Sequence, residues 1–198
     1  MEENMERINA VTFAPFCARG TFEKEETRQS LKLMKEKTGA NYVIFAPNGM
    51  QKTAFSEEID YRTDRNVTDE ELIAMIGYAK ELGLNVALKP TANCEDGTWR
   101  AHINFFDEDV VCEPKWGNWF ASYRAFQEHY AGLAQQCGVD LFIAGCEMGQ
   151  TERREAEWRE VIAAIRRKYD GLVSYNTDKY QEHNVIWWDA VDVFSSSG

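Results

Sequence analysis

The sequence predicts an α/β fold of the (β/α)8-barrel type, with about six of the eight strand–helix units present. Short apolar runs alternate with longer amphipathic segments of helical period, which is typical of a parallel sheet with crossover helices. Long polar loops follow the carboxyl ends of the strand candidates, where a (β/α)8 barrel builds its active site. The first of these turns, residues 14–20, has no GxGxxG pattern, which disfavours an open doubly wound sheet.

Six apolar runs are the strand candidates, namely residues 8–13, 42–46, 85–88, 141–144, 172–175 and 191–194. Helices are expected over residues 23–37, from Thr68 to Gly83, along a stripe from Trp119 to Cys137, and around residues 158–165. Thr68 and Glu71 have the spacing of a capping box. Residues 48–67 are expected to form a polar loop.

No linker or repeat divides the chain, so residues 1–198 are expected to form a single domain. A closed (β/α)8 barrel typically needs ~250 residues. We therefore expect a barrel that is truncated before its seventh and eighth strands.

The composition narrows the class of partner. A formal net charge of −11 disfavours nucleic acid and anionic membranes, whereas a neutral sugar is compatible with it. The five cysteines show no CxxC spacing, so neither a disulfide framework nor a zinc site is expected, and no cofactor fingerprint is present. The amino-terminal residues lack the apolar core of a signal peptide, which favours a cytoplasmic protein, although a removed signal peptide stays an alternative.

Glu147 is the sharpest candidate for a catalytic residue. It follows a wholly apolar strand candidate, at the point where the chain reaches the mouth of the sheet. A carboxyl group in such a partly desolvated cleft can serve as a general acid. From its position alone, a surface glutamate or one paired with an arginine is an equally good interpretation.

Other polar and aromatic residues at strand ends and in the long loops are candidate sugar contacts. Aromatic rings with a polar edge suit the faces of sugars, and amides suit their hydroxyl groups. The candidates are Lys89, Asn93, Trp99, Arg100, Trp116, Tyr175, Asn176 and Trp188. For each of them a structural role, as a core ring or a local hydrogen-bonding group, is the competing interpretation.

An ordered set of motifs resembles glycoside hydrolase family 113 from about Val11 to the last residue. The motifs are Leu88-Lys89-Pro90, Gly97-Thr98-Trp99-Arg100, Trp119-Phe120-x-x-Tyr123, Ile143-Ala144-Gly145-Cys146-Glu147-Met148 and Trp187-Trp188-Asp189. That family consists of (β/α)8 barrels related to the large retaining clan, with β-1,4-mannan-degrading members, and some related sequences are labelled xylanases. No single motif is decisive, but the ordered set is fairly specific.

The resemblance implies roles for individual residues. It implies that Glu147 is the acid/base, and that Lys89 and the pair Trp99-Arg100 lie at sugar subsites. Many enzymes of the wider clan carry an asparagine before the acid/base, and this chain has Cys146 there, which weakens a contact with the sugar 2-hydroxyl borrowed from the clan. The family's nucleophile is a second glutamate at the end of strand seven, and we expect it to lie beyond this chain.

Three functions are compatible with these observations. The first is a retaining glycosidase acting on β-1,4-linked mannan, with xylan next in preference, which would be inactive as the 198-residue chain alone. The second is a non-catalytic sugar-binding or scaffold barrel, which could associate with itself through its open sheet edge. The third is an unrelated α/β enzyme of small-molecule metabolism, which the missing cofactor fingerprint disfavours.

Overall fold

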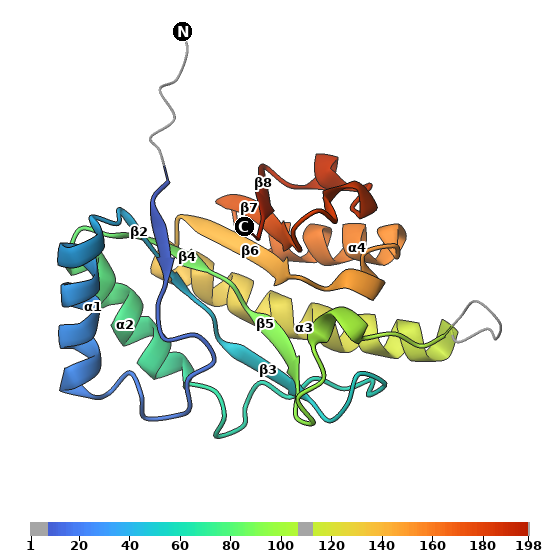
Figure 1. Cartoon of the computed structure of the whole chain (residues 1–198), viewed down its shortest axis with the longest axis horizontal. Coiled ribbons are helices and arrows are strands. Elements are labelled where there is room, and N and C mark those ends of the chain that lie inside the picture. The colour runs from blue at the N-terminus through green and yellow to red at the C-terminus, as the bar shows by residue number, and fades with distance from the viewer. Residues whose placement is uncertain (1–7, 107–112, 198) are drawn as a thin grey trace, which may run out of the picture.

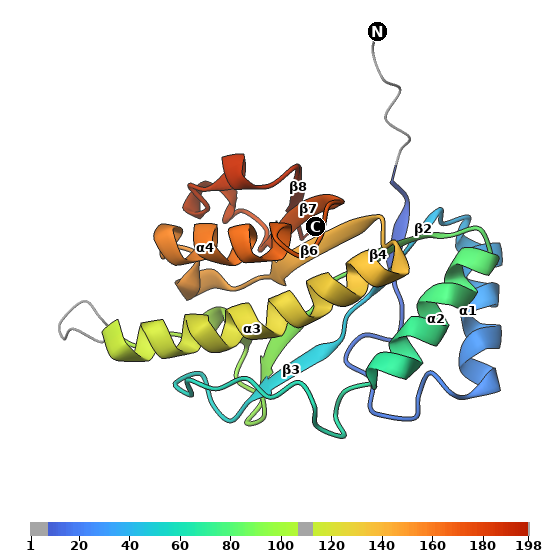
Figure 2. The same cartoon turned by 180° about the vertical axis from the view of Figure 1, so that it is seen from behind.

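The computed structural model describes residues 8–106 and 113–197. Its main sheet has six parallel strands in the order β1-β2-β4-β6-β7-β8. The strands are β1 Ala10–Thr12, β2 Tyr42–Phe45, β4 Asn85–Leu88, β6 Leu141–Cys146, β7 Leu172–Thr177 and β8 Val193–Ser196. The sheet curls, and helices pack on its outer face (Figures 1 and 2). This arrangement confirms the prediction of an incomplete barrel of the (β/α)8 type.

Four α-helices connect the strands: α1 Glu25–Thr38, α2 Asp69–Glu81, α3 Glu113–Cys137 and α4 Glu155–Arg166. Short 3-10 turns are η1 Arg100–His102, η2 Gly149–Thr151, η3 Glu182–Asn184 and η4 Trp188–Ala190. The predicted capping box begins α2, because the Thr68 hydroxyl accepts from the Glu71 amide and the Glu71 carboxylate accepts from the Thr68 amide. Helix α1 ends at Gly39, whose φ of 63° lies in the left-handed region that favours glycine.

A second, two-stranded sheet corrects the expectation of an unbroken loop after residue 47. Strands β3, Asn48–Gln51, and β5, Thr91–Cys94, pair in parallel. They continue β2 and β4 beyond Pro47 and Pro90, where the proline nitrogens cannot donate to the ladder. Pairing resumes at once, with the Thr91 amide donating to the Pro47 carbonyl at 3.0 Å.

Large aromatic side chains dominate the core between the sheet and helices α3 and α4. Trp119, Tyr123, Trp158 and Trp187 are fully buried. The rings of Trp119 and Tyr123 stack at 4.9 Å, as do those of Trp158 and Trp187 at 5.0 Å. The aromatic stripe predicted on the third helix is therefore its core-facing side.

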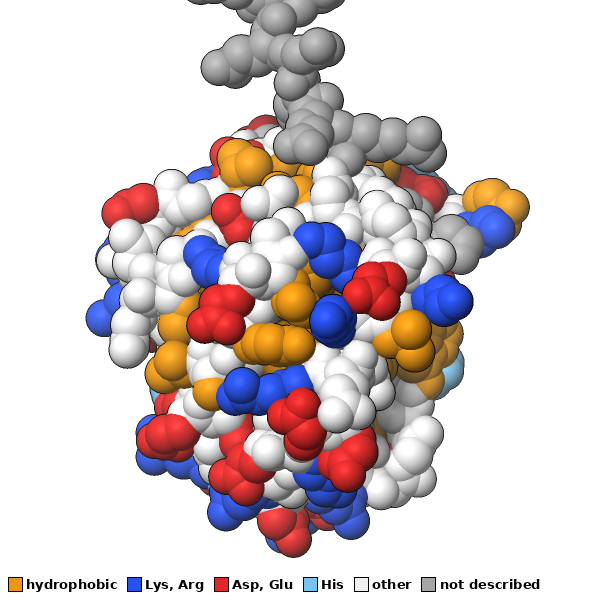
Figure 3. Space-filling view, turned by 90° about the vertical axis from the view of Figure 1, so that its left-hand side faces the viewer, with side chains coloured by type: hydrophobic (Ala, Val, Ile, Leu, Met, Phe, Trp, Pro, Cys, Tyr) orange, Lys and Arg blue, Asp and Glu red, His pale blue; other side chains and the backbone are white. Residues whose placement is uncertain are grey.

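The outer surface near α1 carries acidic and basic side chains interspersed with small hydrophobic areas (Figure 3). In the described part of the chain, no helix combines the length and the hydrophobicity that a membrane crossing requires. Four cysteines, Cys17, Cys94, Cys137 and Cys146, are free thiols, and Cys112 lies outside the described residues.

Candidate active site

Glu147 directly follows β6, one of the two central strands of the six-stranded sheet. Its φ of 52° lies in the left-handed region, which costs a residue with a side chain roughly 1–2 kcal/mol. The pairing of β6 with β7 shifts register between Ile143 and Cys146, so the strand is irregular just before this turn. Non-glycine residues in such conformations cluster at functional sites.

The carboxylate of Glu147 is held through both of its oxygens. Its Oε2 lies 2.7 Å from an Arg100 guanidinium nitrogen, and its Oε1 accepts from the Ser197 hydroxyl at 2.7 Å. The side chains are 20% exposed for Glu147 and 13% for Arg100, so the pair lies in a partly desolvated position that a ligand can still reach. A carboxylate offers about four acceptor positions. These two contacts fix the plane of the group and leave acceptor positions for a ligand.

Arg100 connects three parts of the site. Its Nε donates to the Cys146 carbonyl at 2.6 Å, and another guanidinium nitrogen donates to Asn93 Oδ1 at 3.2 Å. Asn93 in turn donates to Asn48 Oδ1 at 2.8 Å. The planar fork of the guanidinium group therefore ties the end of β6 to the small sheet of β3 and β5.

Asn176 fixes the other side of the Glu147 turn. Its carbonyl accepts from the Glu147 amide at 2.8 Å, and its side-chain amide donates to the Ser197 hydroxyl at 3.0 Å. Of the predicted site residues, the structure thus brings Asn93, Arg100 and Asn176 together around Glu147.

A buried network lies beneath this turn. The Tyr175 hydroxyl accepts from the Met148 amide at 3.1 Å and donates to Glu152 Oε1 at 2.6 Å. The Thr177 hydroxyl donates to the same Glu152 oxygen at 3.1 Å. Burial raises the pKa of Glu152 above its ordinary value, against the opposing effect of the hydrogen bonds from Tyr175 and Thr177.

A hollow of about 430 Å³ is lined by residues that follow the strand ends. Its walls include Trp99, His102, Gly149, Asp178 and Asn184. Trp99 is 43% exposed and meets the His102 ring edge-on at 5.7 Å. An exposed indole beside amide and carboxylate groups suits the apolar face and the hydroxyl groups of a sugar.

Two other predicted residues, Lys89 and Trp188 of η4, do not join the Glu147 network. Lys89 is half-buried between β4 and β5, and the hydrogen bonds and ion pairs of the described residues do not connect it to Glu147. Trp188 is also half-buried, donates through Nε1 to the Glu182 carbonyl, and packs on Phe194 at 4.4 Å.

The expectation that Trp116 and Tyr175 contact sugar is wrong for this structure, because both side chains are fully buried. The Trp116 ring packs edge-on against Phe105 at 4.9 Å and lies under the guanidinium groups of Arg153 and Arg154. Tyr175 lies beneath the Glu147 turn, where it supports the backbone. Their strand-end and helix-start positions did not reveal on which side of the backbone each ring would pack.

Three residues of the site were not predicted. Ser197 lies in the run 195–198, whose composition resembles any polar chain end, and Asn48 lies in a segment that was expected to be a loop. Glu152 lies in the strongly polar segment 149–155, which gives no sign of burial. Only the proximity created by the sheet identifies these three.

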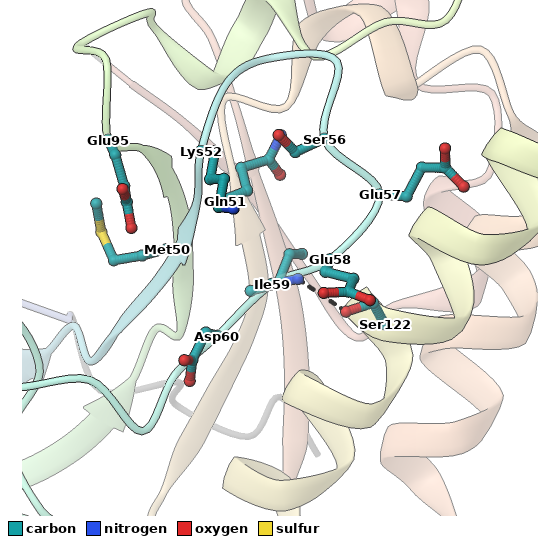
Figure 4. A pocket seen from close by; sticks show the side chains of 10 residues that line it. All are labelled: Met50, Gln51, Lys52, Ser56, Glu57, Glu58, Ile59, Asp60, Glu95 and Ser122. Carbon is teal, nitrogen blue, oxygen red and sulfur yellow. Dashed lines mark hydrogen bonds between the residues drawn. The ribbon is translucent and has the colours of Figure 1, made fainter.

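A larger hollow, of about 760 Å³, does not have Glu147 among its lining residues, which Figure 4 shows. It is lined by the end of β3, the following loop and α3, including Gln51, Glu57, Asp60 and Ser122, and by Glu95. It shares no lining residue with the hollow beside Trp99. Within residues 8–106 and 113–197, no group of three or more histidine, cysteine or acidic side chains is arranged to hold a metal ion.

Solved structures of mannan-degrading enzymes are similar to this chain. A GH113 β-1,4-mannanase is 55% identical with a TM-score of 0.94, over 98% of this chain and 63% of that one. The GH113 β-mannanase AaManA from Alicyclobacillus acidocaldarius, solved in complex with ManMIm, is 42% identical with a TM-score of 0.90, over 96% and 60%. The exo-β-1,4-mannosidase Op5Man5 from Opitutaceae bacterium strain TAV5, at 14% identity and a TM-score of 0.62, shares only the fold.

The chain therefore spans less than two thirds of the length of these two mannanases. No curated protein matches it. The family model of Glycoside Hydrolase Family 113 matches residues 11–198, nearly the whole sequence. Together with the identity to two mannanases of that family, this match confirms the resemblance seen in the motifs: the chain belongs to glycoside hydrolase family 113.

Proposed function

We propose that the full-length protein hydrolyses β-1,4-linked mannan or its oligosaccharides, with Glu147 as the catalytic acid/base. One observation carries the proposal: a glutamate in a left-handed turn at a strand end, partly exposed and held through both carboxylate oxygens. Such a carboxyl group is oriented before a ligand arrives, which is what proton transfer to a leaving group requires.

The proposed reaction is a retaining double displacement. Glu147 protonates the glycosidic oxygen while a second carboxylate attacks the anomeric carbon, and the leaving sugar departs with that proton. Glu147 then takes a proton from water, and the resulting hydroxide equivalent displaces the enzyme carboxylate from the sugar. Each proton that Glu147 gives in the first step is thus recovered in the second.

We propose that the second carboxylate belongs to a strand beyond the six in this sheet. The sheet holds six parallel strands where a closed barrel has eight, and the GH113 mannanase structure is longer than this chain. Retaining hydrolysis needs the two carboxyl groups ~5–5.5 Å apart. That separation requires the second carboxyl group to lie beside the Glu147 carboxyl group at the barrel mouth.

Mannan is the favoured substrate for two reasons. The two similar structures of the family are described as β-1,4-mannanase and β-mannanase, the latter in complex with ManMIm. The hollow beside Trp99 presents this exposed indole with amide and carboxylate groups around it. A chain of net charge −11 also binds neutral polymers without repulsion. We propose that Lys89, Asn93, Asn176 and Trp188 contribute further contacts to sugar hydroxyls and faces.

The first test is Glu147→Gln in the full-length protein, assayed on manno-oligosaccharides. We expect kcat to fall about 10²- to 10⁴-fold, because glutamine keeps the shape of the side chain but cannot transfer the proton. Glu160→Gln, which removes a largely exposed carboxylate from α4, is the matched control and should leave kcat unchanged. Wild-type turnover by Glu147→Gln would exclude the acid/base assignment.

The second part of this test separates substrates and stereochemistry. Hydrolysis of manno-, xylo- and cello-oligosaccharides is compared, and the anomer formed first is identified by proton NMR. We expect the manno-oligosaccharide to be cleaved fastest and its β-anomer to appear first. Binding of these sugars without cleavage would favour the non-catalytic barrel instead.

A further inference from the structure

Glu152 is a fully buried carboxyl group that the proposed reaction does not use. Its exposed fraction is 0%, and it lies between η2 and α4. Its Oε1 accepts from both Tyr175 and Thr177, whereas its Oε2 has no hydrogen-bond partner among the described residues. Burying a polar oxygen without a hydrogen-bond partner costs free energy of folding. Such an oxygen next to the Glu147 turn therefore indicates a role beyond packing.

The hydrogen bonds of Glu152 lead directly to the turn that carries Glu147. The Tyr175 hydroxyl has one proton, and it donates that proton to Glu152 Oε1 at 2.6 Å. Its oxygen is then oriented to accept from the Met148 amide at 3.1 Å. Glu152 therefore determines which way the hydroxyl of Tyr175 points, and the hydroxyl determines where the Met148 amide lies.

That amide is one of three backbone anchors around a strained residue. The Cys146 carbonyl accepts from Arg100, the Glu147 amide donates to Asn176, and the Met148 amide donates to Tyr175. Glu147 adopts a φ of 52°, a conformation that persists only when its surroundings hold it. Loss of one anchor would let the backbone relax and turn the carboxylate away from its position.

Close packing also holds the strand that leads into this turn. A side chain at Gly145 would meet the Tyr123 hydroxyl at 2.7 Å and the Trp158 ring at 3.1 Å, so the strand lies against aromatic rings without any side chain of its own there. The Trp187 indole donates to the Glu152 carbonyl at 3.0 Å, which fixes the backbone of Glu152 to the same core. The network is thus rigid from the core up to the Met148 amide.

We infer that Glu152 is a positioning residue, which acts through the Tyr175 hydroxyl and the Met148 amide to hold the Glu147 carboxyl group in its reactive position. This inference rests on the proposed function of Glu147. In this role Glu152 acts as a hydrogen-bond acceptor, and a negative charge on its side chain is not required. Burial raises the pKa of Glu152, while the hydrogen bonds from Tyr175 and Thr177 oppose that rise.

The test uses three variants of the full-length protein: Tyr175→Phe, Glu152→Leu and Glu152→Gln. Each is assayed on an unactivated manno-oligosaccharide and on dinitrophenyl β-mannobioside, whose leaving group departs without protonation. We expect Tyr175→Phe and Glu152→Leu to lower kcat/KM for the oligosaccharide about 10- to 100-fold, because small misplacements of a catalytic group have effects of this size. For the dinitrophenyl substrate the loss should stay below about threefold, since the first step then needs no acid.

Glu152→Gln is the conservative variant, because its side-chain carbonyl can still accept from Tyr175 and Thr177. It should keep kcat/KM within about threefold of the wild type on both substrates. Thr177→Val is the matched control: it also removes a hydrogen bond to Glu152 Oε1, but leaves the path from Glu152 through Tyr175 to Met148 intact. It should retain the wild-type preference between the two substrates.

Two results would overturn the inference. One is wild-type kcat/KM of Tyr175→Phe on the oligosaccharide, and the other is an equal loss on both substrates, which would indicate general damage to the fold. Tyr175→Phe decides the matter even if Glu152→Leu does not fold. Glu147→Gln, measured in parallel, separates the two proposals, since an active Glu147→Gln variant refutes the acid/base assignment itself.

Discussion

The carboxylate of Glu147 lies 2.7 Å from a guanidinium nitrogen of Arg100, in an ion pair that is mostly shielded from solvent. The pair does not exclude catalysis, because acceptor positions on the carboxylate remain unused. Arg100 also donates to the Cys146 carbonyl, so it orients the backbone and the side chain of the turn together.

The buried carboxyl group of Glu152 predicts a pH dependence of stability. Because its pKa is raised in the folded protein, the folded state binds a proton more tightly than the unfolded chain, whose pKa is near the ordinary value of 4.5. The free energy of unfolding should therefore decrease as the pH rises above 4.5, and level off beyond the folded pKa. Glu152→Gln has no carboxyl group to titrate at this position, so it should not show this decrease. In the wild type the decrease amounts to about 1.4 kcal/mol for each unit by which folding raises the pKa of Glu152.

Urea denaturation between about pH 4 and pH 8 gives the free energies of unfolding of the wild type and of Glu152→Gln. The variant should become more stable relative to the wild type as the pH rises. Glu160→Gln, which removes a carboxylate from the surface of α4, serves as the matched control. A constant difference between wild type and Glu152→Gln over this range would contradict the prediction.

At the scale of elements, the hydrophobic pattern predicted the apolar strands of the main sheet. It missed β3 and β5, which consist largely of polar residues. Strand β4 occupies the predicted range, whereas β6 and β7 each continue two residues further, since Cys146 still pairs with Asn176 after the apolar runs end. Strands β3 and β5 contain asparagine, glycine and glutamine, and no alternation marks them. Their pairing depends on contacts between segments about 40 residues apart, which local pattern does not contain.

Helix ends were better predicted, because capping is local chemistry. The spacing of Thr68 and Glu71 identified the start of α2, and both reciprocal hydrogen bonds are present. The Glu71 carboxylate also accepts from the Phe22 amide at 3.3 Å, so the cap joins α2 to the loop before α1. Sequence could not show this second contact, which links segments that only the fold brings together.

This cap gives a prediction for stability. Thr68→Ala should lower the free energy of unfolding by about 1 kcal/mol, because the Glu71 amide loses its acceptor. Ser30→Ala is the control, since it also removes a hydroxyl from a helix, but from the interior of α1 where alanine is the better helix former. The two variants are compared by thermal and urea denaturation. Equal stability of Thr68→Ala and wild type would show that the capping box contributes nothing.

At the scale of the whole molecule, the sheet is curled but not closed. Strand β1 pairs with β2 and strand β8 with β7, and in the described part of the chain these two edge strands do not pair with each other. The α-helices cover the outer face (Figures 1 and 2). On the inner face, a hollow of about 240 Å³ is lined largely by apolar side chains, among them Ile44, Leu141, Ile143 and Val193.

An open edge beside an apolar hollow predicts that the 198-residue chain associates with itself. Unpaired strand edges are templates for pairing, and Phe194 on β8 is 57% exposed. The net charge of −11 opposes association, so sedimentation velocity should show larger species as protein and salt concentrations rise together. Phe194→Lys should shift the chain toward monomer, because a lysine on an edge strand disfavours pairing. Phe55→Lys changes a similarly exposed phenylalanine away from the edge and should not shift the chain toward monomer. A wild-type chain that stays monomeric under all these conditions would contradict the prediction.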